Sequence, residues 1–375
     1  MKDERNVNYP GMFDLLKGIV VIGIILTHIL DIIPSEALYK GSFSLLKVFV
    51  FSLPRIFSLG TATIPILFMV SGYGFKAISL KKCVRKQAKQ LLRPYLLTGA
   101  AIVAVHFVCH FCAFHYLPGT AKQTGIVALS HLLGIHIGFQ FHGVQLCSIG
   151  SVWFLLALFG GWVLLTLITN TLPEKCHGIL AVCTIILSFL LYKFAAPWVT
   201  YMFCFSGIFL GCGNLYWGAQ IKKRNWLWVP LSPFVLCLLI VLAVAGHLVL
   251  SPSLNIGDSV TLKLVAFLLY IIGAECTAFL MMRVGVRANR WKNWLFDKIR
   301  MVGRYSIWVI CAHSIECQGL LWYLFVEKMR GHELAAFLIM AVVRGILIFA
   351  ICYLINLFDK RIRKARKQRK ASAPV

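Results

Sequence analysis

Two ionisable side chains lie in the first apolar stretch, FDLLKGIVVIGIILTHILDII, at residues 13–33. Lys17 stands near its start, and His28 follows eleven residues later. On an α-helix this spacing places the two side chains about 20° apart around the axis and roughly 16 Å apart along it. Ionisable groups inside a membrane span are costly and usually face a cavity or the interior of a helix bundle. We therefore expect a functional imidazole at His28, with a hydrogen-bonded packing residue as the alternative.

A second imidazole occurs late in the chain. His313 lies about nine residues into an apolar run, and Glu316 follows three residues later on the same helix face. Asp31, one turn after His28, is placed either to orient that imidazole or to pair with a base at the outer surface. These residues indicate acid–base chemistry inside a membrane, because histidine changes its protonation near neutral pH.

Other polar residues within apolar runs have less specific patterns. We expect Glu275 and Arg344 to pair with each other, and the alternative is that both line a central cavity. His106, Cys109 and His110 share a helix face at a spacing that could hold zinc. A fourth ligand is not evident, so we expect no metal.

The elements that position these residues follow from composition. Hydrophobic residues make up 59 % of the 375 residues, charged residues make up 14 %, and the mean hydropathy is +0.81. These values exclude an ordinary soluble domain and predict an all-α polytopic integral membrane protein. Long continuous apolar runs are unlike the short alternating strands of a β-barrel. We expect a single membrane domain over 1–375, with spans from about 13 to 358 and a basic tail at 359–375.

Hydropathy predicts about ten transmembrane helices, at 13–33, 60–79, 94–117, 151–170, 177–195, 197–217, 226–250, 259–282, 305–326 and 334–358. With the N-terminus inside, 29 Lys and Arg residues fall on the cytoplasmic side and 8 on the other. This asymmetry predicts that both termini are cytoplasmic. The net charge of +25 therefore indicates contact with anionic lipid headgroups rather than with nucleic acid.

Two connecting segments are unusual. Residues 44–59 are apolar but contain Pro54 and Arg55, which favours an interfacial or half-buried helix. Residues 119–150 form a long external loop that is too apolar for disorder, so we expect a short helix or a re-entrant segment there.

Five short motifs resemble those of the acyltransferase family 3 membrane proteins, in the family's order and on the matching spans. They are Leu16-Lys17-Gly18 with His28, Phe68-Met-Val-Ser71-Gly-Tyr73, Leu91-Leu-Arg-Pro94-Tyr95, Trp153-Phe-Leu155, and Gly303-Arg-Tyr-Ser306-Ile-Trp followed by His313. Most members have Arg at the position of Lys17. The branch that resembles fucose O-acetylases has Lys there, as this chain does. The resemblance extends from about Phe13 to Phe358.

The resemblance implies an O-acyltransferase that moves acetyl from cytoplasmic acetyl-CoA to a hydroxyl of a cell-surface or lipid-linked glycan. It also implies a multi-pass protein of the bacterial plasma membrane. His28 would be the general base and His313 a second catalytic residue. The alternative is a transporter or flippase of a small polar molecule built on the same membrane domain.

For the acetyl-CoA donor, the resemblance implies a cytoplasmic patch before the Leu-Leu-Arg-Pro-Tyr motif. The family's Arg pair is replaced here by Gln87 and Gln90, with basic residues alongside, and several cations beside a helix start suit phosphates. An ordinary positive-inside loop is the alternative. The expected cofactor-binding residues are Lys17, Ser71, Lys86, Lys89 and Arg93.

The expected substrate-binding residues are Asp31, Trp153, Glu275 and Glu316. For Trp153 the alternative is an aromatic anchor at the membrane interface. For Ser71, close packing of helices at the Ser-Gly pair is the alternative to contact with a ligand.

Overall fold

The computed structural model describes residues 9, 11–33, 62–249 and 260–371. The predicted helix over residues 44–59 lies outside these ranges. The first half of the described chain contains the helices α1 (Asp14–Leu30), α4 (Thr63–Gly72), α5 (Leu80–Gln87), α6 (Arg93–Phe114), α7 (Leu117–Leu132) and α8 (Trp153–Thr171), and the strands β1 (Phe139–Phe141) and β2 (Val144–Leu146).

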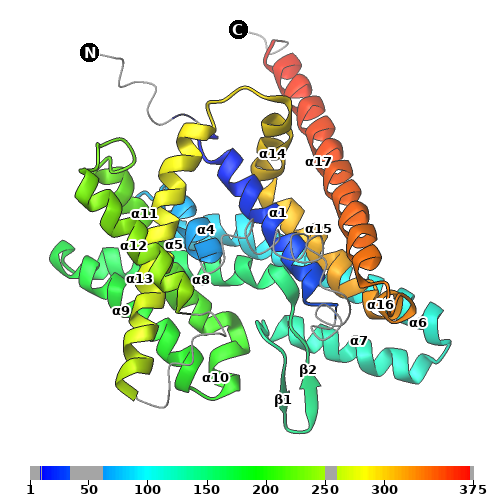
Figure 1. The fold of residues 1–375 in the computed structure, drawn as a ribbon. Helices are drawn as coiled ribbons and strands as arrows, with labels where there is room; N and C mark the ends of the chain where they lie inside the picture. Colours follow the sequence, from blue (N-terminus) through cyan, green and yellow to red (C-terminus); the bar gives the residue numbers. More distant parts are fainter. Residues whose placement is uncertain (1–8, 10, 34–61, 250–259, 372–375) are drawn as a thin grey trace.

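The second half is helical throughout its described elements (Figure 1). Its helices are α9 (Glu174–Phe194), α10 (Pro197–Tyr201), α11 (Phe205–Lys223), α12 (Pro233–Leu248), α13 (Val260–Ala288), α14 (Trp294–Arg304), α15 (Ser306–Gly319), α16 (Trp322–Lys328) and α17 (Glu333–Ala371). The start of α1 and the C-terminal part of α17 lie at the same end of the molecule (Figure 1). The prediction that both termini are cytoplasmic stays a prediction.

Six helices of the described residues are long and apolar enough to cross a membrane, or seven if the bent pair α15 and α16 forms one span. The all-α membrane class is therefore confirmed. The helices α1, α4 and α12 coincide with predicted spans but are shorter, at 17, 10 and 16 residues. The count of ten spans stays a prediction.

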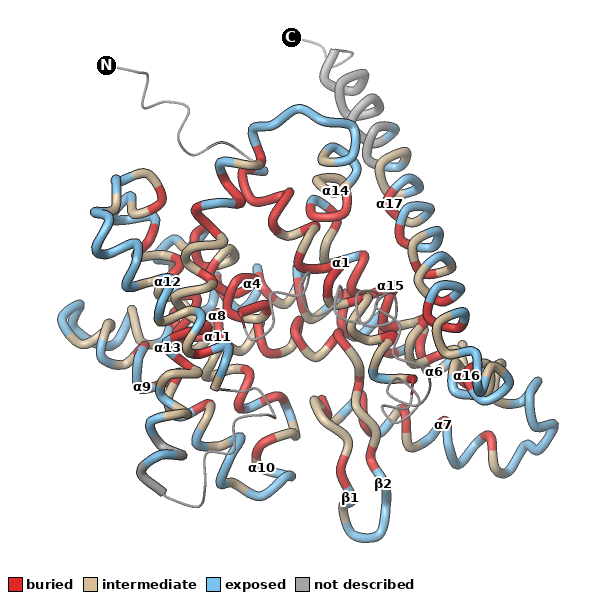
Figure 2. The backbone as a smooth tube through the Cα atoms, in the orientation of Figure 1, coloured by how far each residue is buried: buried red, intermediate tan, exposed pale blue. Residues whose placement is uncertain are grey.

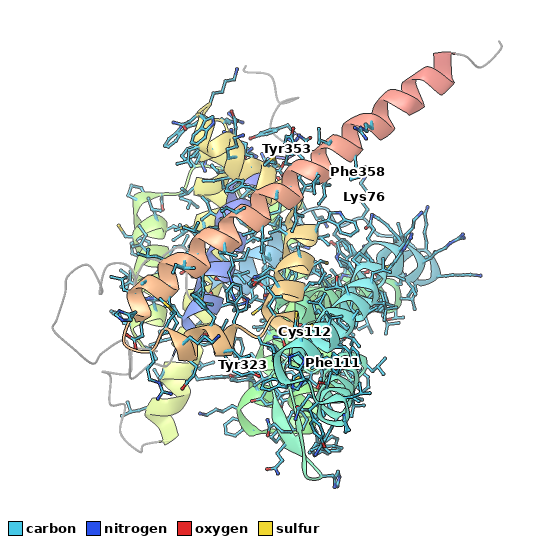
Figure 3. All side chains as sticks on the ribbon, turned by 90° about the vertical axis from the view of Figure 1, so that its right-hand side faces the viewer. Lys76, Phe111, Cys112, Tyr323, Tyr353 and Phe358 are labelled. Carbon is cyan, nitrogen blue, oxygen red and sulfur yellow. The ribbon has the colours of Figure 1, made fainter. Side chains whose placement is uncertain are left out.

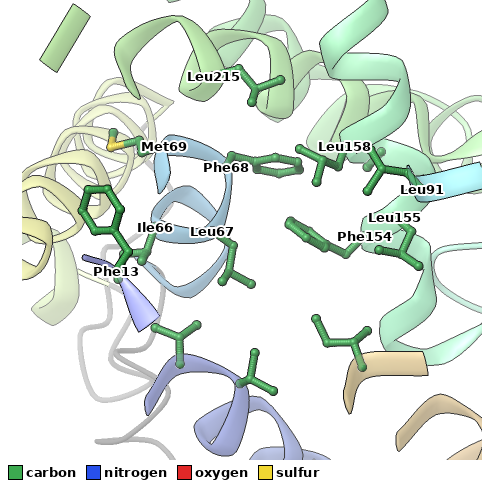
Figure 4. Close-up of a cluster of buried hydrophobic side chains, with 14 of the residues drawn as sticks. Phe13, Ile66, Leu67, Phe68, Met69, Leu91, Phe154, Leu155, Leu158 and Leu215 are labelled. Carbon is green, nitrogen blue, oxygen red and sulfur yellow. The ribbon is translucent and has the colours of Figure 1, made fainter. Parts of the chain in front are cut away.

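Many buried residues lie in the central helices α1, α4 and α15, and many exposed residues lie on the outer helices (Figure 2). Many exposed positions of the outer helices are large and apolar, such as Val108, Ile179 and Ile346. Such surfaces suit hydrocarbon rather than water, because lipid tails solvate apolar side chains. Inside, Phe68 of α4 packs on Phe154 of α8 with ring centroids 4.9 Å apart (Figure 4).

Glycine allows α1 to lie directly against α14. A Cβ atom added at Gly18 would collide with the backbone of Ile299, and one at Gly303 would collide with the backbone of Asp14. The start of α1 is held by Asn289, whose Oδ1 accepts a hydrogen bond from the Leu15 N–H at 3.0 Å. That N–H belongs to the first turn of α1, where backbone donors have no partner within the helix.

The segment from Leu80 to Phe114 is one long helix, which corrects the prediction of a helix start at the Leu-Leu-Arg-Pro-Tyr motif. The chain passes from α5 through a π-helical turn at Ala88–Leu92 into α6. Pro94 has no N–H and would disturb a regular helix, and the wider turn lies directly before it. The motif marks a change in helix geometry rather than a helix end.

The segment predicted as an external loop, residues 119–150, contains most of a short helix, α7. His106 and His110 of α6 bond through their Nδ1 atoms to Thr124 and Thr120 of α7, at 3.0 and 2.9 Å. These contacts join two helices, and among the described residues this face contains no group of three ligands that could hold a metal.

A β-hairpin, β1–β2, follows α7 and was not predicted. Its register pairs Phe139 with Leu146 and Phe141 with Val144. His142 and Gly143 at its tip both have positive φ angles, 45° and 80°, as a two-residue hairpin turn requires.

Candidate active site

His28 and His313 are brought together although 285 residues separate them in the sequence. His28 lies in the last turn of α1, closer to the end of the helix than the sequence indicates. Its Nδ1 is 2.9 Å from Nε2 of His313 on α15, and the two rings are stacked with centroids 5.1 Å apart. The two predicted catalytic imidazoles therefore belong to one site.

Glu316 holds the other side of the His313 ring. Its Oε1 is 2.7 Å from His313 Nδ1, one helical turn away on α15. The indole N–H of Trp322 donates to Glu316 Oε2 at 2.7 Å. Trp322 reaches this position because the chain bends by 59° between α15 and α16. The sequence predicts one span over 305–326, and the bend within it places an additional donor on the carboxylate.

Arg344 of α17 pairs with Glu316 rather than with Glu275, which corrects the predicted pairing. Its Nε lies 2.9 Å from Glu316 Oε1, and the residue is only 1 % exposed. The guanidinium also donates to the backbone carbonyl of Ile25 on α1 at 3.3 Å. A buried ion pair needs such additional partners, because both charges lose their hydration. The pair thus joins α1, α15 and α17 around the imidazoles.

The hydrogen-bond network assigns the protons. Glu316 is an acceptor when ionised, so His313 donates from Nδ1 and presents an unprotonated Nε2. His28 must then donate from Nδ1 to His313, and the lone pair of a neutral His28 lies on its Nε2 atom. Among the described residues, His28 Nε2 has no hydrogen-bond partner. This nitrogen is therefore available to accept a proton from a bound molecule.

His28 lines a cavity of about 380 Å³ bounded by α1, α4, α8 and α15. Asp31, Thr63, Ser151 and Trp153 line the same cavity. Ser151 Oγ also lies 3.1 Å from His28 Nδ1, so His313 and Ser151 both contribute to the orientation of the imidazole. Two predicted substrate-binding residues, Asp31 and Trp153, therefore line the same cavity as His28.

His136, which follows α7, packs its ring on Trp153 with centroids 3.9 Å apart. Its carbonyl accepts a hydrogen bond from the hydroxyl of Ser148 at 2.7 Å, and its N–H donates to the carbonyl of Tyr201 at 2.9 Å. Burial lowers the pKa of His136 to about 4, so the ring is neutral near pH 7. Ser151 and His136 could not be predicted from local sequence patterns, because only the folded 133–152 segment brings them to the site.

On the other side of the imidazole pair, His313, Glu316 and Arg344 line a second cavity of about 300 Å³. Its remaining walls are apolar and come from α6, α15 and α17, which lie together on one side of the molecule (Figure 3). Cys317 Sγ lies close to His28 and His313, with the three possible ligand atoms within 4.8 Å of one another. However, Cys317 Sγ also lies 3.9 Å from the Arg344 guanidinium, whose charge disfavours a divalent cation.

The predicted cofactor-binding residues are distributed over three parts of the fold. Lys17 lies near the start of α1, 2.9 Å from the carboxylate of Asp14. Lys86, Lys89 and Arg93 are exposed on the helix that runs from α5 into α6. Ser71 is half-buried at the end of α4, where a Cβ atom at the next residue, Gly72, would collide with the backbone of Leu215. The close approach of α4 to α11 thus explains the glycine of the Ser-Gly pair.

Glu275 lies elsewhere, on α13. Its Oε1 accepts a hydrogen bond from the side chain of Asn214 on α11 at 3.2 Å. It lines a different cavity, none of whose residues lines the cavity at His28. The structure therefore does not bring Glu275 to the other predicted substrate-binding residues.

Comparison with known protein families agrees with this site. A family model described as an acyltransferase domain, that of acyltransferase family 3, matches residues 12–357. The chain therefore belongs to this family and is a multi-pass membrane acyltransferase. No match was found among curated proteins or among solved structures.

Proposed function

We propose that this acyltransferase moves acetyl from cytoplasmic acetyl-CoA to a hydroxyl of a cell-surface or lipid-linked glycan, with His28 as general base. The observation that supports the proposal is the chain of contacts from Glu316 through His313 to His28, beside a cavity that has both polar and apolar side chains in its walls. An alcohol is a weak nucleophile, and a base that removes its proton in the transition state accelerates its attack on a thioester.

The proton transfer follows from the assigned tautomers. The acceptor O–H gives its proton to His28 Nε2 as its oxygen attacks the acetyl carbonyl carbon and the thioester C–S bond breaks. His28 then carries a positive charge, and its Nδ1–H donates to His313 Nε2. The Glu316 carboxylate stabilises that charge through His313, in the way that a carboxylate supports the imidazole of a Ser-His-Asp triad. The proton on His28 leaves with the departing thiolate.

The cavity at His28 supports a sugar-like acceptor. The indole of Trp153 offers a flat apolar surface, and Asp31, Thr63 and Ser151 offer groups that hydrogen-bond to hydroxyls. Lys17, Ser71, Lys86, Lys89 and Arg93 are proposed to hold the acetyl-CoA donor, through its phosphates where they are cationic. Membrane lipids would contact the remaining outer surface.

The test is acetyl transfer by the purified protein in lipid nanodiscs. We expect release of free CoA that depends on a glycan acceptor, together with a mass increase of one acetyl group on that acceptor. The alternative is a transporter or flippase, in which the intramembrane charges form a pathway. Acceptor uptake into sealed vesicles without consumption of acetyl-CoA would support that alternative and contradict the proposal. Comparison of surface glycans by mass spectrometry, with and without this protein, would then identify the modified sugar.

A further inference from the structure

A cavity of about 590 Å³ lies between α4, α11, α12 and α13, away from the imidazole pair. Its walls are almost entirely apolar, and they include the aromatic side chains of Trp217, Trp226 and Phe279. The loop between α11 and α12 closes one side and is held by Arg283 of α13, whose guanidinium donates to the backbone carbonyls of Trp226 and Val229. The volume falls within the range of small-molecule binding sites.

Glu275 is an acidic residue in this apolar wall. Its Oε1 is bonded to Asn214, but its Oε2 is buried and has no hydrogen-bond partner among the described residues. Asn214 Oδ1 is also buried without a partner in the described chain. The two unsatisfied acceptors belong to one hydrogen-bonded pair of side chains, of which only Glu275 lines the cavity. Burying such groups is costly unless a donor satisfies them.

We propose that this cavity binds an organic amine, with an apolar body between α11, α12 and α13 and a protonated nitrogen at Glu275. A cationic nitrogen complements the carboxylate of Glu275, which lines the cavity, and the aromatic side chains of Trp217, Trp226 and Phe279 offer apolar surface to the body of the amine. A hydrated inorganic ion does not suit this cavity, because apolar side chains cannot replace the water molecules that coordinate the ion. This site is independent of the acyl transfer proposed above.

The experiment measures binding of 4-phenylbutylamine and of its uncharged counterpart, 4-phenylbutan-1-ol, to the full chain in nanodiscs by ligand-observed NMR, with empty nanodiscs subtracted. We expect the amine to bind at least tenfold more tightly than the alcohol. Glu275→Gln should remove this preference, and Glu327→Gln, which changes an exposed acid on α16, should keep it.

A second variant covers the case in which Glu275→Gln does not fold. Leu239→Trp fills the cavity from α12 without touching the carboxylate, and it should weaken binding of both probes at least tenfold. Equal affinity of the wild-type protein for amine and alcohol would overturn the proposal. So would a folded Glu275→Gln variant that still prefers the amine, or unchanged binding in Leu239→Trp.

Discussion

His313 Nε2 lies 2.9 Å from His28 Nδ1, and His313 Nδ1 lies 2.7 Å from the carboxylate of Glu316. The two imidazoles therefore form a continuous path from a buried carboxylate to the edge of a cavity. Glu316 orients the ring of His313, and His313 in turn orients the ring of His28. A change at Glu316 should therefore alter the orientation and basicity of His28 Nε2.

Glu316→Gln should lower the turnover of acetyl transfer by roughly 10²–10⁴-fold, because the charge that stabilises protonated His28 is lost. It should also destabilise the protein by about 3–5 kcal/mol, because Arg344 becomes an unpaired buried charge. The double variant Glu316→Gln/Arg344→Met should recover thermal stability but not turnover. Recovery of both together would show that Glu316 acts only on folding.

The general features of this site could be predicted from the sequence. The spacing of Lys17 and His28 on one helix stripe, and the position of His313 three residues before Glu316, drew attention to both imidazoles. Glu316 was predicted to bind substrate, whereas the structure places it against His313 and Arg344. The pairing of Arg344 could not be predicted, because several acids lay in candidate spans and periodicity does not order the helices. Only the packing of α17 against α1 and α15 selects Glu316.

Ser151 and Trp322 show a second limit of sequence reasoning. Ser151 reaches His28 because the chain turns into α8 beside the end of α1, and Trp322 reaches Glu316 because of the 59° bend after α15. Both depend on tertiary geometry at places where no local pattern distinguishes these residues from their neighbours. The apolar runs predicted the helices well, but not where short helices break or begin.

Trp153→Ala should raise the KM for the glycan acceptor about tenfold with a smaller change in kcat, because the ring lines the cavity but takes no proton. Trp153→Phe keeps a flat ring and should stay within a few-fold of wild type. Steady-state kinetics with varied acceptor at saturating acetyl-CoA measures both constants. An unchanged KM in Trp153→Ala would place the acceptor elsewhere.

Lys86→Ala and Arg93→Ala should each weaken acetyl-CoA binding several-fold, and the loss should shrink at high salt, because screening reduces phosphate attraction at exposed cations. Isothermal titration with acetyl-CoA at low and high ionic strength measures this. Lys328→Ala, which removes a cation from α16, is the matched control. Normal binding by both Lys86→Ala and Arg93→Ala would exclude this segment from the donor site.

The pKa of His136 predicts a pH dependence of stability. It is about 4 in the folded protein and about 6.5 in the unfolded chain, so the unfolded chain takes up the proton first as pH falls. The contribution of His136 is therefore fully present above about pH 6.5 and is lost as pH falls from there towards 4. His136→Gln should show a smaller drop in Tm between pH 7.5 and pH 5 than wild type. An equal drop in both proteins would contradict a buried neutral ring.

The most direct measurement is the rate of acetyl transfer per folded molecule in His28→Ala, with acetyl-CoA binding measured on the same sample. We predict near-normal binding and a turnover reduced by about 10²–10⁴-fold, because the proton acceptor is gone. His313→Ala, measured beside it, should also lose activity if the two imidazoles act as one unit. Full turnover in folded His28→Ala would contradict the assignment of His28 as general base.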